Sequence, residues 1–323
     1  MTKFIRIFLF LLLGASLLII MYSLGSKHYN QYDDIKNKVK MFKSDDSLID
    51  SIVLGSSHAF CISPDALGYE NGVLMNHGGA DPFEVHFQAK CLSELVDLEA
   101  VFISISYFTF FIDNSSYTDD TGNNSRRENR IMLYAGYPSW RLISENDYSN
   151  FILGKGYPLF SFDHWRSVFT GKTKFPNKSN DDWDEAVIEK NRQRKKFLLD
   201  RHARSRVKKF HGIIKKMSLL NKDVHEDAYD IVLQTAEDLE NKNVRVIFFT
   251  PPFWKTYNEL FEEKYKLATR KAMKAISHST GAEYYDFSEH PYFQKHPELF
   301  LNSDHLNKDG YSIFNSMLKE AIQ

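Results

Sequence analysis

The chain has 323 residues, 43% of them hydrophobic and 26% charged, which is enough for one sizeable folded domain with additions. With 41 basic and 42 acidic residues the formal net charge is -1, so no global electrostatic field points to nucleic acid. Two cysteines, Cys61 and Cys91, are too few for a disulfide scaffold. They either pair outside the cytoplasm or stay as buried thiols, and we favour thiols.

The first segment predicts a membrane anchor. Residues 7–24 carry no charge, and a helix of that length crosses roughly 30 Å of hydrocarbon. Lys3 and Arg6 precede it, which favours a cytoplasmic N-terminus and an extracytoplasmic remainder, periplasmic or at the cell surface. A cleaved signal peptide is the alternative, but the apolar run is long for one. We expect a cytoplasmic tip and single-pass transmembrane helix over residues 1–25, then a polar linker over 26–48.

Residues 49–323 alternate short apolar runs with helical patterns. Strands are predicted at 51–54, 73–75, 100–105, 244–249 and 283–287, and helices at 82–98, 228–240, 257–279 and 308–322. Asp81 and Pro82 are typical N-cap and first helical residues. This alternation indicates an α/β domain whose mostly parallel sheet is covered on both faces, with its site at the carboxyl ends of the strands.

Residues 113–225 interrupt the alternation, and we interpret them as an insertion that is mainly helical in its second half. Its basic run, 190–216, holds 12 Lys or Arg and one acid, Asp200. One interpretation is a solvated helix face above an apolar stripe. The other is contact with anionic lipid headgroups or an acidic glycan, since each Lys or Arg at a membrane surface contributes about 1 kcal/mol. Extracytoplasmic placement disfavours nucleic acid.

A candidate nucleophile follows the first predicted strand, in Val53-Leu54-Gly55-Ser56-Ser57-His58. Glycine permits a tight turn directly after a strand. A serine placed there exposes its hydroxyl, and backbone N–H groups at a helix N-terminus can bind an oxyanion. The motif alone also fits a phosphate-binding turn or a plain turn.

A candidate base precedes the last predicted helix, in Asn302-Ser303-Asp304-His305-Leu306-Asn307. Serine is a weak nucleophile unless a base within hydrogen-bond reach takes its proton. A strand-end serine early in the chain and a loop histidine before the last helix together predict a Ser57–His305 catalytic pair.

These segments resemble the motif blocks of the SGNH or GDSL-like hydrolases. Gly55-Ser56-Ser57 resembles the first block, Asn76-His77-Gly78-Gly79 the second, and Asp304-His305-Leu306-Asn307 with Gly310 the last. Residues 249–252 with Tyr257, and 285–288, resemble a membrane-anchored bacterial envelope branch that includes the lipoteichoic-acid D-alanylation protein. The likeness covers about residues 50–112 and 226–323, and it implies a three-layer α/β/α flavodoxin-like fold.

The resemblance also implies a reaction and its partners. Its members transfer acyl groups through a serine without metal or cofactor, and this branch modifies cell-envelope polysaccharide, with some members working beside a membrane-bound O-acyltransferase. Backbone N–H groups of Ser57 and Gly79 are the expected oxyanion donors. Ser106 is a further candidate donor, because the third-block asparagine is absent. His58, Asn76 and His77 flank the site as substrate contacts or as structural residues. His77, Asp81 and His86 do not complete a metal site.

One departure concerns the group that orients His305. Asn302 stands where the family has an aspartate, and in serine proteases that exchange costs about 10⁴-fold in turnover. Asp304 can supply the carboxylate, Asp286 can do so from a strand end, or the enzyme works as a Ser–His dyad; we favour Asp304. The lead hypothesis is an acyl-ester hydrolase or O-acyltransferase. The alternative is a weak or inactive SGNH-fold protein that binds glycan or partners a membrane-bound O-acyltransferase.

Overall fold

The computed structural model describes residues 38–43, 48–114, 192–220 and 222–323, with isolated positions between 5 and 16. Two compact units divide the chain: Met1–Lys38 with Thr118–Lys178, and Val39–Tyr117 with Ser179–Gln323. Most of the predicted anchor and linker, and residues 115–191 of the predicted insertion, lie outside the described residues. Among the residues that are described, no helix combines the length and apolar character needed to cross a membrane.

Five parallel strands form the sheet, in the order β2-β1-β3-β4-β5. Their bounds are Ser51–Leu54 for β1, Val73–Leu74 for β2, Ala100–Ser104 for β3, Arg245–Thr250 for β4 and Glu283–Asp286 for β5. The residues of β1 and β3 are buried throughout, as parallel strands covered on both faces require. The predicted α/β class with a mostly parallel sheet is confirmed. Four of the five strands fall within a predicted run, and β4 extends one residue beyond its run, to Thr250.

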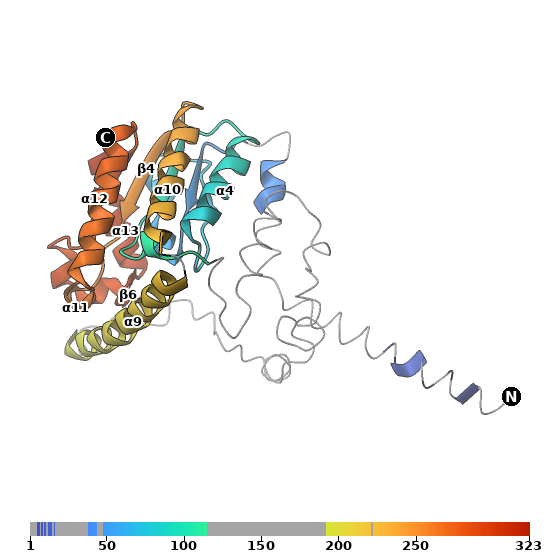
Figure 1. Cartoon of the computed structure of the whole chain (residues 1–323), viewed down its shortest axis with the longest axis horizontal. Coiled ribbons are helices and arrows are strands. Elements are labelled where there is room, and N and C mark those ends of the chain that lie inside the picture. Colours follow the sequence, from blue (N-terminus) through green and yellow to red (C-terminus); the bar gives the residue numbers. More distant parts are fainter. Residues whose placement is uncertain are drawn as a thin grey trace. The chain divides into compact units, whose positions relative to one another are not determined.

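Helices pack on both faces of this sheet. On one face α10 (Val224–Glu240) contacts α4 (Pro82–Ser93) and α12 (Glu263–Ser279), and Figure 1 shows the three side by side. On the other face α13 (Lys308–Ile322) contacts the short α3 (Pro64–Leu67). The α4 helix begins as predicted, because the Asp81 side chain accepts a hydrogen bond from the Glu84 N–H and Pro82 occupies the first position.

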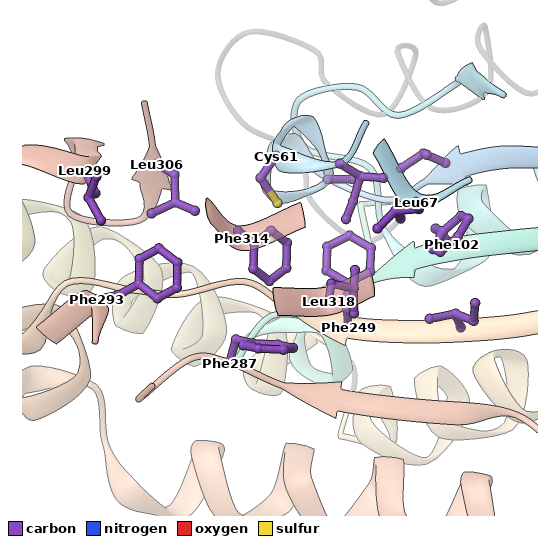
Figure 2. Close-up of a cluster of buried hydrophobic side chains, with 14 of the residues drawn as sticks. Cys61, Leu67, Phe102, Phe249, Phe287, Phe293, Leu299, Leu306, Phe314 and Leu318 are labelled. Atoms are coloured by element: carbon purple, nitrogen blue, oxygen red, sulfur yellow. The ribbon is translucent and has the colours of Figure 1, made fainter. Parts of the chain in front are cut away.

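The core between the sheet and α13 is rich in aromatic side chains. Phe102 and Phe249 from neighbouring strands meet Phe314 and Leu318 of α13 in one buried cluster, drawn in Figure 2. Truncating a fully buried phenylalanine to alanine costs about 3–5 kcal/mol, so this cluster holds the last helix against the sheet. Cys61 belongs to the same cluster, and both cysteines are free thiols, as favoured from the sequence.

A long helix from the predicted insertion joins this unit. The α9 helix (Arg192–Leu220, 29 residues) buries a stripe at three- and four-residue spacing, namely Leu199, Ala203, Val207, Phe210, Ile214 and Met217. It contacts α11 (Lys255–Leu260), the turn η2 (Thr109–Phe111) that follows β3, and the turn η7 (Pro297–Leu299). In Figure 1 it lies next to α11 and β6 (Phe300–Asn302). The helix therefore lies near the carboxyl edge of β3.

Candidate active site

The strand order creates a crevice at one edge of the sheet. The chain passes from β1 to β2 on one side and then crosses to β3 on the other side of β1. Connections therefore leave the carboxyl ends of β1 and β3 in opposite directions, and ligands of open α/β sheets bind at such a point. Ser57 follows β1 and Ser106 follows β3, so both serines lie at this crevice.

Gly55 makes the turn that presents Ser57. Its φ of 116° is one that residues with a Cβ rarely adopt, and a Cβ there would collide with the Ser104 hydroxyl and lie 3.1 Å from the Ser104 nitrogen. Ser56 caps the turn η1 (Ser57–Cys61) by accepting a hydrogen bond from the His58 N–H at 3.4 Å. Ser57 is thus the first residue of a helical turn, where backbone N–H groups lack partners within the turn.

Ser57 and His305 are in hydrogen-bond contact. His305 Nε2 lies 2.9 Å from Ser57 Oγ, and His305 Nδ1 lies 3.0 Å from Asn302 Oδ1. A hydroxyl that donates to Nε2 leaves the ring proton on Nδ1, which then donates to the amide oxygen of Asn302. The antiparallel pairing of β6 with β7 (His305–Leu306) places Asn302 opposite His305. We call Ser57 and His305 the outer pair, because both are partly exposed.

Asp304 is buried behind His305. Its Oδ1 lies 3.4 Å from His305 Nδ1, and its Oδ2 accepts hydrogen bonds from Arg206 Nε at 2.7 Å and His58 Nε2 at 3.3 Å. Burial alone would raise the pKa of Asp304, but the contacts with His305 and His58 lower it well below its usual value. Asp304 is therefore an ionised carboxylate. Asn302 accepts the proton of Nδ1, and Asp304 supplies the negative charge beside it.

A second Ser–His contact lies deeper in the protein. His58 Nδ1 is 2.5 Å from Ser106 Oγ, and we call these two residues the inner pair. Burial lowers the pKa of His58 to about 4, so its ring is neutral near neutral pH. The ring proton lies on Nε2, because an unprotonated Nε2 would face the Asp304 carboxylate. Nδ1 then accepts the hydroxyl proton of Ser106. Both pairs converge on Asp304, and the two imidazole rings are 5.0 Å apart.

Several predicted site residues have other contacts. Ser106 is 1% exposed, and its single hydroxyl proton is directed at His58 rather than toward Ser57. His58 is 2% exposed and bonded at both nitrogens, so neither ring nitrogen is free to bind a further group. Asp286, considered as an orienting acid, accepts hydrogen bonds from Arg270 and Ser288 instead.

The second motif block runs beside the nucleophile turn. The His77 N–H donates to the carbonyl of Gly55 at 3.2 Å, which holds the loop after β2 against the turn. His77 Nε2 lies 2.6 Å from Glu84 Oε1, and the His77 side chain is partly exposed, whereas Asn76 is 5% exposed. Gly79 has a φ of 78°. Asn114 donates a side-chain hydrogen bond to its carbonyl at 2.7 Å.

The contribution of α9 to the site was missed from the sequence. Arg206 donates to Asp304, and His202 Nδ1 lies 2.8 Å from Ser303 Oγ and 3.9 Å from Asp304 Oδ1. Among the 12 basic residues of the run nothing marks Arg206 out by type. Its position one residue before buried Val207, at the margin of the apolar stripe, was the one available signal.

Ligand-type atoms of His58, Asp304 and His305 lie within 4.8 Å of one another. The donors are nevertheless committed: Arg206 occupies Oδ2, His58 is bonded at both nitrogens, and Ser57 faces Nε2 of His305. A cation placed there would also be repelled by the guanidinium of Arg206. The arrangement suits proton transfer rather than metal binding.

A narrow cavity lies at the site, and its lining includes Ser57 and His305 of the outer pair, His58 of the inner pair and the carboxylate Asp304. The other lining residues are Cys61, Pro251, Leu306 and Tyr311. No protein-family model matches the sequence, and no match is found among curated proteins. The function is therefore inferred from the residues and their geometry.

Proposed function

We propose that this protein is a serine-dependent acyl-ester hydrolase or O-acyltransferase of the SGNH, or GDSL-like, superfamily. The 2.9 Å contact between Ser57 Oγ and His305 Nε2, at the carboxyl end of β1, carries the proposal. The strand order β2-β1-β3-β4-β5 supports the finer assignment of a three-layer, flavodoxin-like SGNH fold. The first and last motif blocks, far apart in sequence, meet at one crevice, which supports the same assignment.

The proposed reaction begins when Ser57 Oγ attacks the acyl carbonyl carbon and His305 Nε2 takes the hydroxyl proton. The ester C–O bond breaks, His305 returns the proton to the leaving alkoxide, and an acyl-serine remains. Water as the second acceptor gives hydrolysis, and a sugar hydroxyl gives O-acyl transfer. His305 removes the proton of either acceptor and delivers it to Ser57 Oγ when the acyl–serine bond breaks.

The imidazolium formed in each step is stabilised by two groups. Asn302 keeps the proton-bearing Nδ1 in place, at 3.0 Å, and thereby selects the tautomer that leaves Nε2 free as a base. Asp304 Oδ1, 3.4 Å from Nδ1, adds the negative charge that an asparagine lacks. The charge is held in a low-dielectric environment, because the Asp304 side chain is fully buried. Asn302 and Asp304 together therefore supply the orientation and the negative charge that a single aspartate supplies in the family pattern.

Oxyanion stabilisation is assigned to backbone groups. The N–H groups of Ser57 and Gly79 are the proposed donors, and Ser106 supports the site through His58 instead of donating directly. Each oxyanion donor contributes about 10²–10³-fold to turnover in related chemistry. Two donors without a third side-chain amide are consistent with a moderate rate.

Substrate and location follow from the family resemblance. We propose an acylated cell-envelope polysaccharide as substrate and an extracytoplasmic catalytic domain anchored by the N-terminal segment, with a membrane-bound O-acyltransferase as a partner. Asn302 in place of the family aspartate favours a second candidate, a weakly active or inactive SGNH-fold protein that binds glycan or serves such a partner.

Covalent labelling separates the two candidates. The full chain is treated with a fluorophosphonate probe, and the modified peptide is mapped by mass spectrometry. We expect an adduct on Ser57, none in Ser57→Ala, and unchanged labelling in Ser106→Ala, the matched serine of the inner pair. Absence of labelling in protein shown to be folded by circular dichroism, with ester turnover unchanged in Ser57→Ala, would refute the enzyme proposal.

A further inference from the structure

The solvent face of α9 carries a row of cations. Arg201, Arg204, Lys208 and Lys215, here called the cationic stripe, are all exposed. Their spacings of three, four and seven residues place them on one side of a helix, opposite the buried stripe. At 1.5 Å per residue the row spans about 21 Å. The single acid of α9, Asp200, is held by Trp254 Nε1 and Thr256 Oγ1.

These four charges have no acidic partner among the described residues. Within the part of the chain that the structure describes, none of the four forms an ion pair. By contrast, Arg270 of α12 pairs with Asp286 and Glu289. Arg201, Arg204 and Lys208 repel one another, because their spacings of about 4.5 and 6 Å along the axis are shorter than the screening length of about 8 Å at physiological ionic strength. A bound polyanion would remove this repulsion and release counterions.

The same helix reaches the candidate active site. Arg206 and His202 contact Asp304 and Ser303 from a different side of α9 than the cationic stripe. A helix with its side chains is about 10–12 Å across, so a polymer bound to the stripe has to extend about that far around α9 to reach the outer pair. One element therefore connects a cationic surface to the residues that position the catalytic charge.

Features of α9 favour a soluble polyanion over a membrane. An interfacial helix inserts an apolar face into the lipid, but the apolar stripe of α9 is buried against the protein. Its exposed apolar side chains stand only at the two ends, at Phe197 and Leu198 and at Leu219 and Leu220. Between these ends the exposed side chains are mostly charged, and Ile213 is partly exposed.

We propose that the cationic stripe binds a polyanionic glycan bearing carboxylate or phosphate groups and presents its acyl esters to Ser57. Presentation to Ser57 rests on the proposed function, whereas binding does not. The stripe thus defines the substrate class as an acidic, acylated polymer rather than a neutral one.

Binding is tested with the full chain carrying Ser57→Ala, so that no turnover occurs. The probe is polygalacturonate, with neutral dextran as the uncharged control and titration calorimetry as the measurement. The variant Arg204→Glu/Lys208→Glu is compared with Lys271→Glu/Lys274→Glu, which changes the same charge at exposed positions of α12. We expect the stripe variant to weaken binding about 10-fold or more and to reduce its salt dependence, and the α12 variant to bind within about 3-fold of the parent.

Three outcomes would overturn the proposal. Equal weakening by both variants would mean a response to net charge alone. No binding of polygalacturonate would exclude an acidic glycan as the ligand of the stripe. Tighter binding to phosphatidylglycerol vesicles than to the polymer would show that the stripe binds a membrane.

Turnover gives a separate readout in chains that retain Ser57. With acetylated polygalacturonate, the stripe variant should raise KM about 10-fold at unchanged kcat, and turnover of p-nitrophenyl acetate should not change. Binding without turnover in the parent chain would sink the proposed function and leave the binding site standing. Turnover with the same KM in the parent and in the stripe variant would contradict the proposed binding site and leave the proposed function standing.

Discussion

The outer pair and the inner pair use the same two side-chain types and the same carboxylate, yet they meet solvent differently. Ser57 and His305 are partly exposed, whereas Ser106 and His58 are 1% and 2% exposed, although His58 lines the same cavity as the outer pair. The proton directions differ as well. Ser57 contacts Nε2 of His305, whose Nδ1 carries its proton toward Asn302 and Asp304. In the inner pair the order is reversed, because Ser106 contacts Nδ1 of His58 and Nε2 donates its proton to Asp304.

A Ser–His–Asp contact is thus not sufficient to define a nucleophile. Burial leaves the inner pair unreachable by substrate and lowers the pKa of His58 to about 4, which makes it a poor base. What the inner pair can do is hold the Asp304 carboxylate, together with Arg206, so that its second oxygen faces His305. The following expectations test this division between chemistry and positioning.

Replacing the two histidines should separate the pairs most clearly. His305→Gln removes the base and should lower kcat for an activated ester about 10⁴-fold. His58→Gln keeps a side-chain amide near Asp304 and should lower kcat only about 10-fold, because His58 acts through another residue. Initial rates with p-nitrophenyl acetate measure both variants. Comparable losses in well-folded proteins would contradict the division.

Asp304→Asn affects both pairs at once. We expect a loss of about 10²–10³-fold in kcat, because the imidazolium of His305 loses its counter-charge. We also expect about 3 kcal/mol less stability, the low end for breaking a buried pair, since Arg206 remains partly exposed. Urea unfolding and steady-state rates measure the two effects. Asn302→Leu is the matched change, and we expect it to lower the unfolding free energy by a smaller amount, about 1–2 kcal/mol. A larger effect at Asn302 than at Asp304 would reverse the assigned roles.

The inner pair should also reveal itself in the pH dependence of stability. The pKa of His58 falls from 6.5 to about 4 on folding, so between these values the unfolded chain binds more protons than the native protein. Stability contributed by neutral His58 is therefore complete above pH 6.5 and is lost as pH falls toward about 4. The difference in unfolding free energy between the parent and His58→Gln should change by about 3 kcal/mol over that window. A constant difference would show that His58 is not buried as a neutral ring.

Ser106→Ala should have the smallest effect. It removes one hydrogen bond to His58 Nδ1, so we expect a stability loss of about 1 kcal/mol and turnover within about 3-fold of the parent. Thermal unfolding and ester turnover are the measurements. A loss approaching that of Ser57→Ala would instead place the Ser106 hydroxyl in the oxyanion site.

The sequence predicted the outer pair because local patterns place it: a strand that ends at a glycine, and a capped last helix preceded by a histidine. Asp304 was favoured for its adjacency to His305. The inner pair could not be predicted, since the contact of His58 with Ser106 depends on β1 and β3 being neighbours. Strand order is set by long-range packing, which periodicity does not encode.

Arg206 illustrates a second limit. Helical periodicity correctly indicated a helix in the basic run, and α9 covers most of it. Which of its arginines turns inward depends on the surface against which the apolar stripe packs, and that surface comes from segments before and after it in the chain. The predicted likeness at about residues 50–112 and 226–323 therefore left out Arg206, a partner of the Asp304 carboxylate.

The link between Arg206 and Asp304 bears on how this protein can be trimmed. The two residues are 98 positions apart, and the guanidinium is a counter-charge that the sheet and its own helices do not replace in this structure's described residues. A shortened chain without residues 113–225 would leave the buried Asp304 carboxylate without Arg206. It would also expose the ring of Phe108, which stacks on Phe210. Deletions that end before Arg192 keep the ion pair between Arg206 and Asp304. The end of the insertion and the α/β core that it packs against therefore share buried contacts that neither part supplies alone.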